Sequence, residues 1–173
     1  VGLVKLNKSA NETIFYNNAN SELLNNHISA IAVDDSGMKW IGTYGYGICS
    51  FDGKNWVDFN TNNSELANDT INTIVTDGNG VKWIGTMNGL VCFDGGSWTT
   101  YNTQNSDLPN NVVNSIAIDT DGCFWIGTDD GGLARFNGSD WTLFSSDQSG
   151  LYSDVISIAI DNNNTKWIGS KSN

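Results

Sequence analysis

The side chains with the greatest potential for chemistry lie in loops at equivalent positions along the sequence. Most of these loops follow a W-I-G motif, and together they carry aromatic, carboxylate and amide groups. Aromatic faces stack on the C–H face of a sugar, while carboxylates and amides pair with its hydroxyls. We therefore expect an oligosaccharide at one rim of the protein, although such residues are also common in loops that are merely solvated. The expected site residues are Tyr44, Tyr46, Asn88, Asp129 and Asp130, with His27 in support.

Catalytic machinery is not expected. His27 is the one histidine of the chain, and the corresponding positions of the other repeats hold Thr70, Val112 and Asp154. Acid–base catalysis needs a positioned base or two groups with contrasting pKa values. The motifs G-x-S-x-G and H-E-x-x-H are absent as well. The sequence therefore predicts a protein that is not an enzyme and holds no cofactor.

A metal site is not expected either. The segment 119–122, D-T-D-G, looks like the opening of a calcium loop, but the closing glutamate of that loop is missing. Asp and Gly at these positions are typical of a β-turn, and similar segments recur in the other repeats. The three cysteines, Cys49, Cys92 and Cys123, form no C-x-x-C motif, and we interpret them as small hydrophobic residues.

The charge of the chain excludes several classes of partner. Its formal net charge is -11, with only 8 Lys and Arg among 173 residues. Nucleic acids and anionic membranes attract basic patches, which this composition does not offer. No apolar run approaches the roughly 20 residues of a membrane-spanning helix. We expect no nucleic acid and no membrane insertion.

A tetrapeptide that recurs at nearly constant spacing indicates the architecture. W-I-G-T begins at Trp40, Trp83 and Trp125, and W-I-G-S begins at Trp167, at intervals of roughly 42 residues. That period suits one four-stranded antiparallel blade, and no sustained helical period is present. In the second repeat, β-branched and alternating segments separated by Asp-Gly turns predict strands at 71–76, 81–86, 90–93 and 98–101.

Tryptophans form two rows in this repeat. The W-I-G tryptophans sit in mid-strand among apolar neighbours, so we expect them to pack between blades with a local partner for each indole N–H. The outer-strand row comprises Trp56, Trp98 and Trp141. This row is a candidate contact surface between blades or between chains.

One blade is divided between the two ends of the sequence. Residues 1–18 hold a third and an outer strand, and residues 155–173 hold a first and a second strand. Pairing within one chain would give a four-bladed ring, and pairing across two chains would give an eight-bladed homodimer. A piece of a larger propeller is the third interpretation. We expect a single domain over 1–173, with full blades at 28–60, 71–102 and 113–145.

The repeat resembles the two-component regulator propeller family. The resemblance rests on W-I-G-T, the Gly-rich turn and strand after it, the preceding S-x-L link, and the stretch 116–122, I-A-I-D-T-D-G. It implies a β-propeller of the kind found in extracytoplasmic sensor domains of bacterial hybrid histidine kinases, where oligosaccharides are the usual ligands.

The expected function is therefore non-catalytic sensing of an oligosaccharide in an extracytoplasmic location: periplasmic, secreted or at the cell surface. A protein-interaction or structural scaffold is the alternative, with an acidic rim or an outer face as its contact. A glycan lyase or hydrolase ranks behind both, because it would require two converging carboxylates in a pocket.

Overall fold

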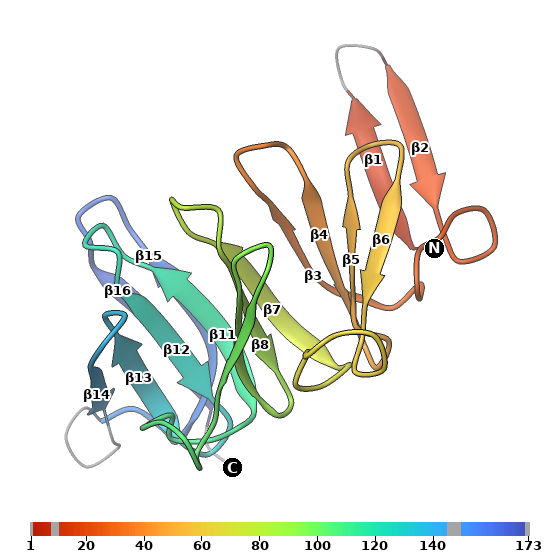
Figure 1. The fold of residues 1–173 in the computed structure, drawn as a ribbon. Coiled ribbons are helices and arrows are strands. Elements are labelled where there is room, and N and C mark those ends of the chain that lie inside the picture. Colours follow the sequence, from red (N-terminus) through yellow and green to blue (C-terminus); the bar gives the residue numbers. More distant parts are fainter. Residues whose placement is uncertain (1, 8–10, 145–149, 172–173) are drawn as a thin grey trace.

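The computed structural model describes residues 2–7, 11–144 and 150–171. All regular secondary structure in these ranges is β-strand. Three blades of four antiparallel strands stand in a row, with a two-stranded hairpin at either end (Figure 1). The first blade contains β3 (Ile28–Val33), β4 (Lys39–Thr43), β5 (Ile48–Phe51) and β6 (Trp56–Phe59). The second contains β7 (Ile71–Thr76), β8 (Lys82–Thr86), β9 (Gly89–Phe93) and β10 (Trp98–Tyr101). The third contains β11 (Val113–Ile118), β12 (Phe124–Thr128), β13 (Gly132–Phe136) and β14 (Trp141–Phe144).

The terminal hairpins are β1 (Leu3–Asn7) with β2 (Glu12–Tyr16), and β15 (Asp154–Ile160) with β16 (Lys166–Lys171). Within each blade the strands follow one another in sequence order, as in a simple meander. This arrangement confirms the all-β propeller fold. Residues 1, 8–10, 145, 172 and 173, which the expected blade boundaries include, lie outside the described residues.

One aspartate organises each turn between a first and a second strand. In the second blade, Asp77 Oδ1 accepts hydrogen bonds from the backbone N–H groups of Asn79 at 2.9 Å and Val81 at 3.0 Å, and Asp77 Oδ2 accepts the Trp83 indole N–H at 3.2 Å. Asp34, Asp119 and Asp161 repeat this arrangement. The segment 119–122 is thus a turn whose carboxylate is already occupied by backbone and indole donors, as the turn interpretation predicted.

The glycine of W-I-G lets neighbouring blades approach closely. A Cβ placed on Gly85 would lie 2.7 Å from Val113 Cγ1 in the next blade and 2.6 Å from Thr73 Cγ2 in its own blade. Real Cβ atoms do not tolerate such distances, so any side chain at this position would force the blades apart. The same contact recurs between Gly42 and Ile71, and between Gly127 and Val155.

The hydrophobic core lies between blades rather than within them. One buried cluster joins Trp83 and Leu90 of the second blade to Ile116 and Phe124 of the third. A second cluster joins the first blade to the second, and a third joins the N-terminal hairpin to the first blade. Each blade therefore depends on its neighbours for the burial of its apolar faces.

The cysteines belong to this core, as expected. Cys49 and Cys123 are buried, and Cys92 is half-buried. Burial raises the pKa of the Cys49 thiol to about 11. At neutral pH this thiol is protonated and behaves as a small apolar side chain.

The two terminal hairpins do not join within the chain. They form separate two-stranded sheets at opposite ends of the row of blades, so four complete blades are not assembled from one chain (Figure 1). Of the two closures considered from the sequence, the four-bladed ring within a single chain is thus not formed. The W-I-G tryptophans diverge accordingly: Trp40 and Trp83 are each 6% exposed, whereas Trp167 in the last hairpin is 63% exposed. The expectation of inter-blade burial is wrong for Trp167, because no blade within the described residues packs against its exposed face.

Candidate ligand-binding rim

The loops singled out in the sequence do lie on one rim, because backbone hydrogen bonds tie each of them to the segment that precedes its blade. Tyr44 N–H donates to the carbonyl of His27 at 3.1 Å, and Met87 N–H donates to that of Thr70 at 3.3 Å. In the third blade, Asp129 N–H donates to the Val112 carbonyl at 3.0 Å. The loop after the second strand and the entrance to the first strand are therefore neighbours in every full blade.

A second set of hydrogen bonds links the rim from blade to blade. Gly47 N–H donates to the Asp69 carbonyl at 2.8 Å, and Gly89 N–H donates to the Asn111 carbonyl at 2.7 Å. Gly132 N–H donates to Ser153 in the same way, at 2.7 Å. Gly47 has φ +85° and packs against the backbone of Phe59, a combination that other residues rarely tolerate. These bonds hold the rim loops in fixed positions on the strands.

Exposed aromatic rings gather at the first blade. The His27 ring stacks on the Tyr44 ring, with centroids 5.2 Å apart and an angle of 24° between planes. Tyr44 is 56% exposed, and Tyr46, two residues along the same loop, is 54% exposed. Gly45 between them has φ +82°, which produces the sharp bend of the loop. This aromatic corner presents flat apolar surface to solvent on a well-anchored loop.

The amide and carboxylates predicted for the site lie along the rim of the second and third blades. Asn88 is exposed, and its side-chain N–H donates to the Ala67 carbonyl at 3.4 Å. Asp130 has φ 54° and accepts the Ser153 hydroxyl at 2.8 Å. Asp129 is also exposed. The six predicted residues thus share a rim but are spread over three blades, and the direct side-chain contact that the structure shows among them joins His27 to Tyr44.

An ion pair lies at the end of the rim formed by the last hairpin. Lys171 Nζ lies 2.9 Å from Asp154 Oδ2, and the Asp154 side chain is only 2% exposed. The hydrogen bond and the charge of Asp154 raise the pKa of Lys171, and Asp129 adds a further attraction. The ammonium group therefore stays charged and partly neutralises the acidic end of the rim.

Sequence reasoning missed a set of three equivalent grooves at the periphery. Each lies between the outer strands of adjacent repeats and is lined by an outer-row tryptophan and by the S-x-L link, with volumes of about 380, 560 and 550 Å³. Each tryptophan is half-buried and stacks on the phenylalanine of the third strand, as Trp56 does on Phe51 with centroids 4.1 Å apart. Trp98 also packs on Phe59 of the preceding blade, with ring centroids 5.6 Å apart, so the outer-row tryptophans contribute to contacts between blades, which was one of the two roles expected for them. The Ser, the Glu or Asp, and the Trp that line each groove recur in the sequence, but the repeat alone does not indicate that they meet across adjacent repeats.

The described residues contain neither a candidate metal site nor a membrane-spanning helix. No group of three or more His, Cys, Asp or Glu residues within 2–7, 11–144 and 150–171 could hold a metal ion. Over the same ranges, no helix has the length and apolar character needed to cross a membrane.

Comparison with protein families confirms the resemblance seen in the sequence. The family model described as "Two component regulator propeller" matches residues 107–130, which include the last two residues of the S-x-L link, β11 and the W-I-G-T of β12. No curated protein gives a significant match. The chain therefore carries a regulator propeller repeat, and the same sequence pattern recurs in its other blades.

Solved propellers superimpose well on the chain. The extracellular domain assigned to the hybrid two component system BT3049 of B. thetaiotaomicron has a TM-score of 0.82 and 28% identity, over 91% of this chain and 22% of that one. The corresponding domain of BT4673 from the same organism has a TM-score of 0.77 and 22% identity, over 98% and 24%. Virginiamycin B lyase from Staphylococcus aureus has a TM-score of 0.65 and 16% identity, over 83% and 49%. The chain thus spans less than a quarter of the two sensor domains.

Proposed function

We propose that this chain is a non-catalytic, ligand-binding segment of an extracytoplasmic bacterial sensor propeller, and that it binds an oligosaccharide at the rim. The site consists of Tyr44, Tyr46, Asn88, Asp129, Asp130 and His27. The observation that carries this proposal is the aromatic corner, because two tyrosines more than half exposed and a stacked histidine leave flat apolar faces open to solvent. Such faces suit the C–H surface of a pyranose ring.

The similarity to extracellular sensor domains supports sensing rather than catalysis. At 28% identity, the BT3049 domain shares both the fold and the repeat with this chain. The likeness to virginiamycin B lyase, at 16% identity, concerns the fold alone. The same comparison supports an extracytoplasmic location, which is part of the proposal.

The electrostatics of the chain also favour binding over acid–base chemistry. A general acid at neutral pH needs a carboxyl group with a raised pKa. Hydrogen bonds from the backbone and side chain of Asn55 lower the pKa of Asp52 to about 2, and turn hydrogen bonds lower the pKa of Asp94 and Asp161. The chain uses these carboxylates to build turns.

Titration of the purified chain with a panel of plant and host oligosaccharides, followed by thermal unfolding and calorimetry, tests the proposal. A ligand at 100 times its Kd adds about 2.7 kcal/mol to the free energy of unfolding. We expect Tyr44→Ala to weaken binding by about 2 kcal/mol, roughly 30-fold, because stacked aromatic side chains are typical hot spots.

Val57→Ala is the matched control, because Val57 is 52% exposed in the outer strand of the same blade and does not belong to a rim loop. Binding that survives Tyr44→Ala but is lost in Trp98→Ala would move the site to the peripheral grooves and contradict the rim. Absence of a saturable response to any sugar would instead favour the scaffold function.

A further inference from the structure

The three peripheral grooves share one construction. Each is lined by an outer-row tryptophan of one repeat, by an aromatic ring of the preceding repeat, and by the serine and the acidic residue of the S-x-L link. Both walls of each groove lie within the described residues. In chain order, the pairs of tryptophan and acidic residue are Trp56 with Glu22, Trp98 with Glu65, and Trp141 with Asp107.

Aromatic packing fixes the tryptophan of each groove. In the second groove, Trp98 stacks on Phe93 of its own blade with ring centroids 4.2 Å apart, while the ring of Phe59 in the preceding blade lies 5.6 Å away. The first and third grooves repeat this cluster with Tyr16 and Tyr101 in place of Phe59. A ring that is already held by two others loses little further freedom when a ligand binds, which favours binding.

The indole N–H groups of these tryptophans are open to solvent. The W-I-G tryptophans donate to an aspartate, as Trp83 does to Asp77 at 3.2 Å. Within the described residues no acceptor is found for the N–H of Trp56, Trp98 or Trp141, whereas every buried side-chain nitrogen or oxygen there has a partner. The three N–H groups are therefore not buried, and each can donate a hydrogen bond to a ligand in its groove.

The link that forms the other wall is tied to the outer strand before it. In the second groove, Asn63 donates its side-chain N–H to the Asp58 carbonyl at 3.2 Å, and the Ser64 hydroxyl donates to the Asn60 carbonyl at 2.8 Å. Leu66, next to the acidic residue, is only 4% exposed and anchors the link in the core. The same asparagine and serine bonds occur in the other two grooves. The backbone that carries each acidic residue is therefore in place before a ligand binds.

The acidic residues of the grooves have no cationic partner in the described part of the chain. Glu22, Glu65 and Asp107 are exposed, and none of them takes part in an ion pair there. The whole chain holds 19 Asp and Glu but only 8 Lys and Arg. A cationic ligand therefore meets favourable charge both at these side chains and over the chain as a whole.

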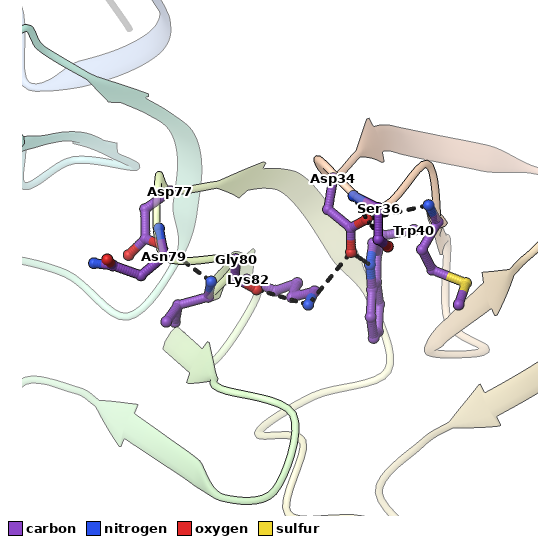
Figure 2. Close-up of polar contacts among 9 residues, drawn as sticks. Asp34, Ser36, Trp40, Asp77, Asn79, Gly80 and Lys82 are labelled. Carbon is purple, nitrogen blue, oxygen red and sulfur yellow. Dashed lines mark hydrogen bonds and ion pairs between the residues drawn. The ribbon is translucent and has the colours of Figure 1, made fainter.

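The chain itself shows which group a tryptophan and a carboxylate bind together. At the junction of the first two blades, Lys82 Nζ lies 3.5 Å from Asp34 Oδ2 and 4.7 Å from the centre of the Trp40 ring (Figure 2). Lys166 makes the equivalent contacts at the junction of the third blade with the last hairpin. In both places a cation lies over an aromatic ring and beside a carboxylate. The second and third grooves carry the same two groups, but the described residues that line them include no Lys or Arg.

We propose that the peripheral grooves bind arginine side chains from a basic segment of a partner protein. A guanidinium group is flat and stacks against an indole ring, and its fork of donors fits a carboxylate. In the second groove these contacts involve Trp98 and Glu65. The indole N–H donates to a backbone carbonyl of the same segment. Because the grooves follow one another from blade to blade, a segment with several suitably spaced arginines gains affinity by filling more than one.

One difference among the grooves sharpens the proposal. The hairpin that lines the first groove carries Lys54, where the second and third grooves have Gly96 and Ser139. An ammonium group in the groove repels an incoming guanidinium. We therefore expect the second and third grooves to bind arginine more tightly than the first.

Titration of the purified chain with the blocked tripeptide Gly-Arg-Gly, followed by NMR of the indole N–H signals, tests the proposal. We expect saturable shifts at Trp98 and Trp141, a weaker affinity at Trp56, and no shift at Trp83, whose N–H is bonded to Asp77. The control ligand Gly-citrulline-Gly has nearly the same shape but no charge, and it should bind about threefold more weakly. Added salt should reduce this difference, because the carboxylates are exposed.

Two charge variants separate binding from folding. Glu65→Gln keeps the size of an exposed side chain and removes its charge, so the affinity at Trp98 should fall about threefold while that at Trp141 is unchanged. Lys54→Ser should raise the affinity of the first groove by a similar factor. Tyr44→Ala alters the rim and should leave all three grooves unaffected, so failure of the rim proposal and failure of the groove proposal are distinguishable.

Equal binding of the arginine and citrulline peptides would overturn the proposal, because the grooves would then not recognise charge. Absence of any shift at the three outer-row tryptophans would overturn it as well. An oligosaccharide that shifts the Trp98 signal when the arginine peptide does not would assign the grooves to sugar instead.

Discussion

Trp83 and Trp167 begin the same motif and yet experience different surroundings. Each donates its indole N–H to an aspartate six residues earlier, at 3.2 Å for Asp77 and 3.0 Å for Asp161. Trp83 is 6% exposed because the third blade covers it, whereas Trp167 is 63% exposed at the end of the row. The repeat thus encodes the turn and the orientation of the ring, but the next blade supplies the burial.

Replacement of these two tryptophans gives the largest expected contrast. Trp83→Ala should lower the free energy of unfolding by about 3–5 kcal/mol, because it removes a buried aromatic side chain and leaves a cavity. Trp167→Ala should lower the free energy of unfolding by less than about half of the Trp83→Ala value, because most of the Trp167 side chain is already exposed to water. Both values are to be measured by urea denaturation of the purified chain.

Equal losses for the two variants would contradict the comparison, because they would mean that local turn contacts rather than inter-blade packing determine the stability. The local contribution can be measured separately with Trp83→Phe, which keeps most of the buried ring area and removes the indole donor to Asp77.

Features confined to one repeat could be predicted from the sequence. The strand at 71–76 was predicted with its observed bounds, and the Asp-Gly turn after it follows from the side-chain hydrogen bonds that Asp makes to the backbone. The rim placement of His27 and Tyr44 also follows, because the loop and the link meet at the same end of a blade.

Features that depend on two repeats could not be predicted in this way. The lysine position of the repeat holds Lys82 at one junction and Phe124 at the next, and the partner of each belongs to the preceding blade. The peripheral grooves likewise form where an outer tryptophan meets a link from another part of the repeat. Sequence periodicity gives the contents of a repeat, while packing angles decide which side chains of two repeats meet.

The second contrast compares Gly85, where two blades approach closely, with the exposed Gly78 as a control. Gly85→Ala would place a Cβ 2.6 Å from Thr73 Cγ2 and 2.7 Å from Val113 Cγ1, so we expect a loss of about 3 kcal/mol from overpacking between blades. Gly78 lies in the exposed turn with open space around it, and Gly78→Ala should change stability by less than about 0.5 kcal/mol. A tolerated Gly85→Ala, seen as an unchanged denaturation midpoint, would show that the blades can separate without cost.

The smallest expected effect concerns the ion pair of Lys82 with Asp34, whose contribution to stability depends on pH. Burial acts to raise the pKa of Asp34, but hydrogen bonds from Ser36, Trp40 and Met38 and the charge of Lys82 outweigh burial and lower it from 3.8 to about 2. A carboxylate with a pKa lowered in the folded state stabilises the protein above its unfolded pKa, and this stabilisation disappears as the pH falls through about 2. A shift of this size corresponds to roughly 2 kcal/mol.

Lys82→Met should destabilise the chain by about 1 kcal/mol at pH 7, because Asp34, whose side chain is 8% exposed, keeps its charge and loses its cationic partner, while the hydrogen bonds that account for most of its pKa shift remain. The pKa of Asp34 should rise in this variant, so the difference from the unaltered chain should shrink between about pH 4 and pH 2, as the carboxylate becomes protonated in both. Denaturation curves across that range measure the effect, with the exposed Lys54→Met as control. If the difference in the free energy of unfolding stayed constant with pH, the packing of Lys82 over Trp40 rather than its charge would account for its role. Lys82 would then resemble Phe124, which packs on Trp83 with ring centroids 4.1 Å apart.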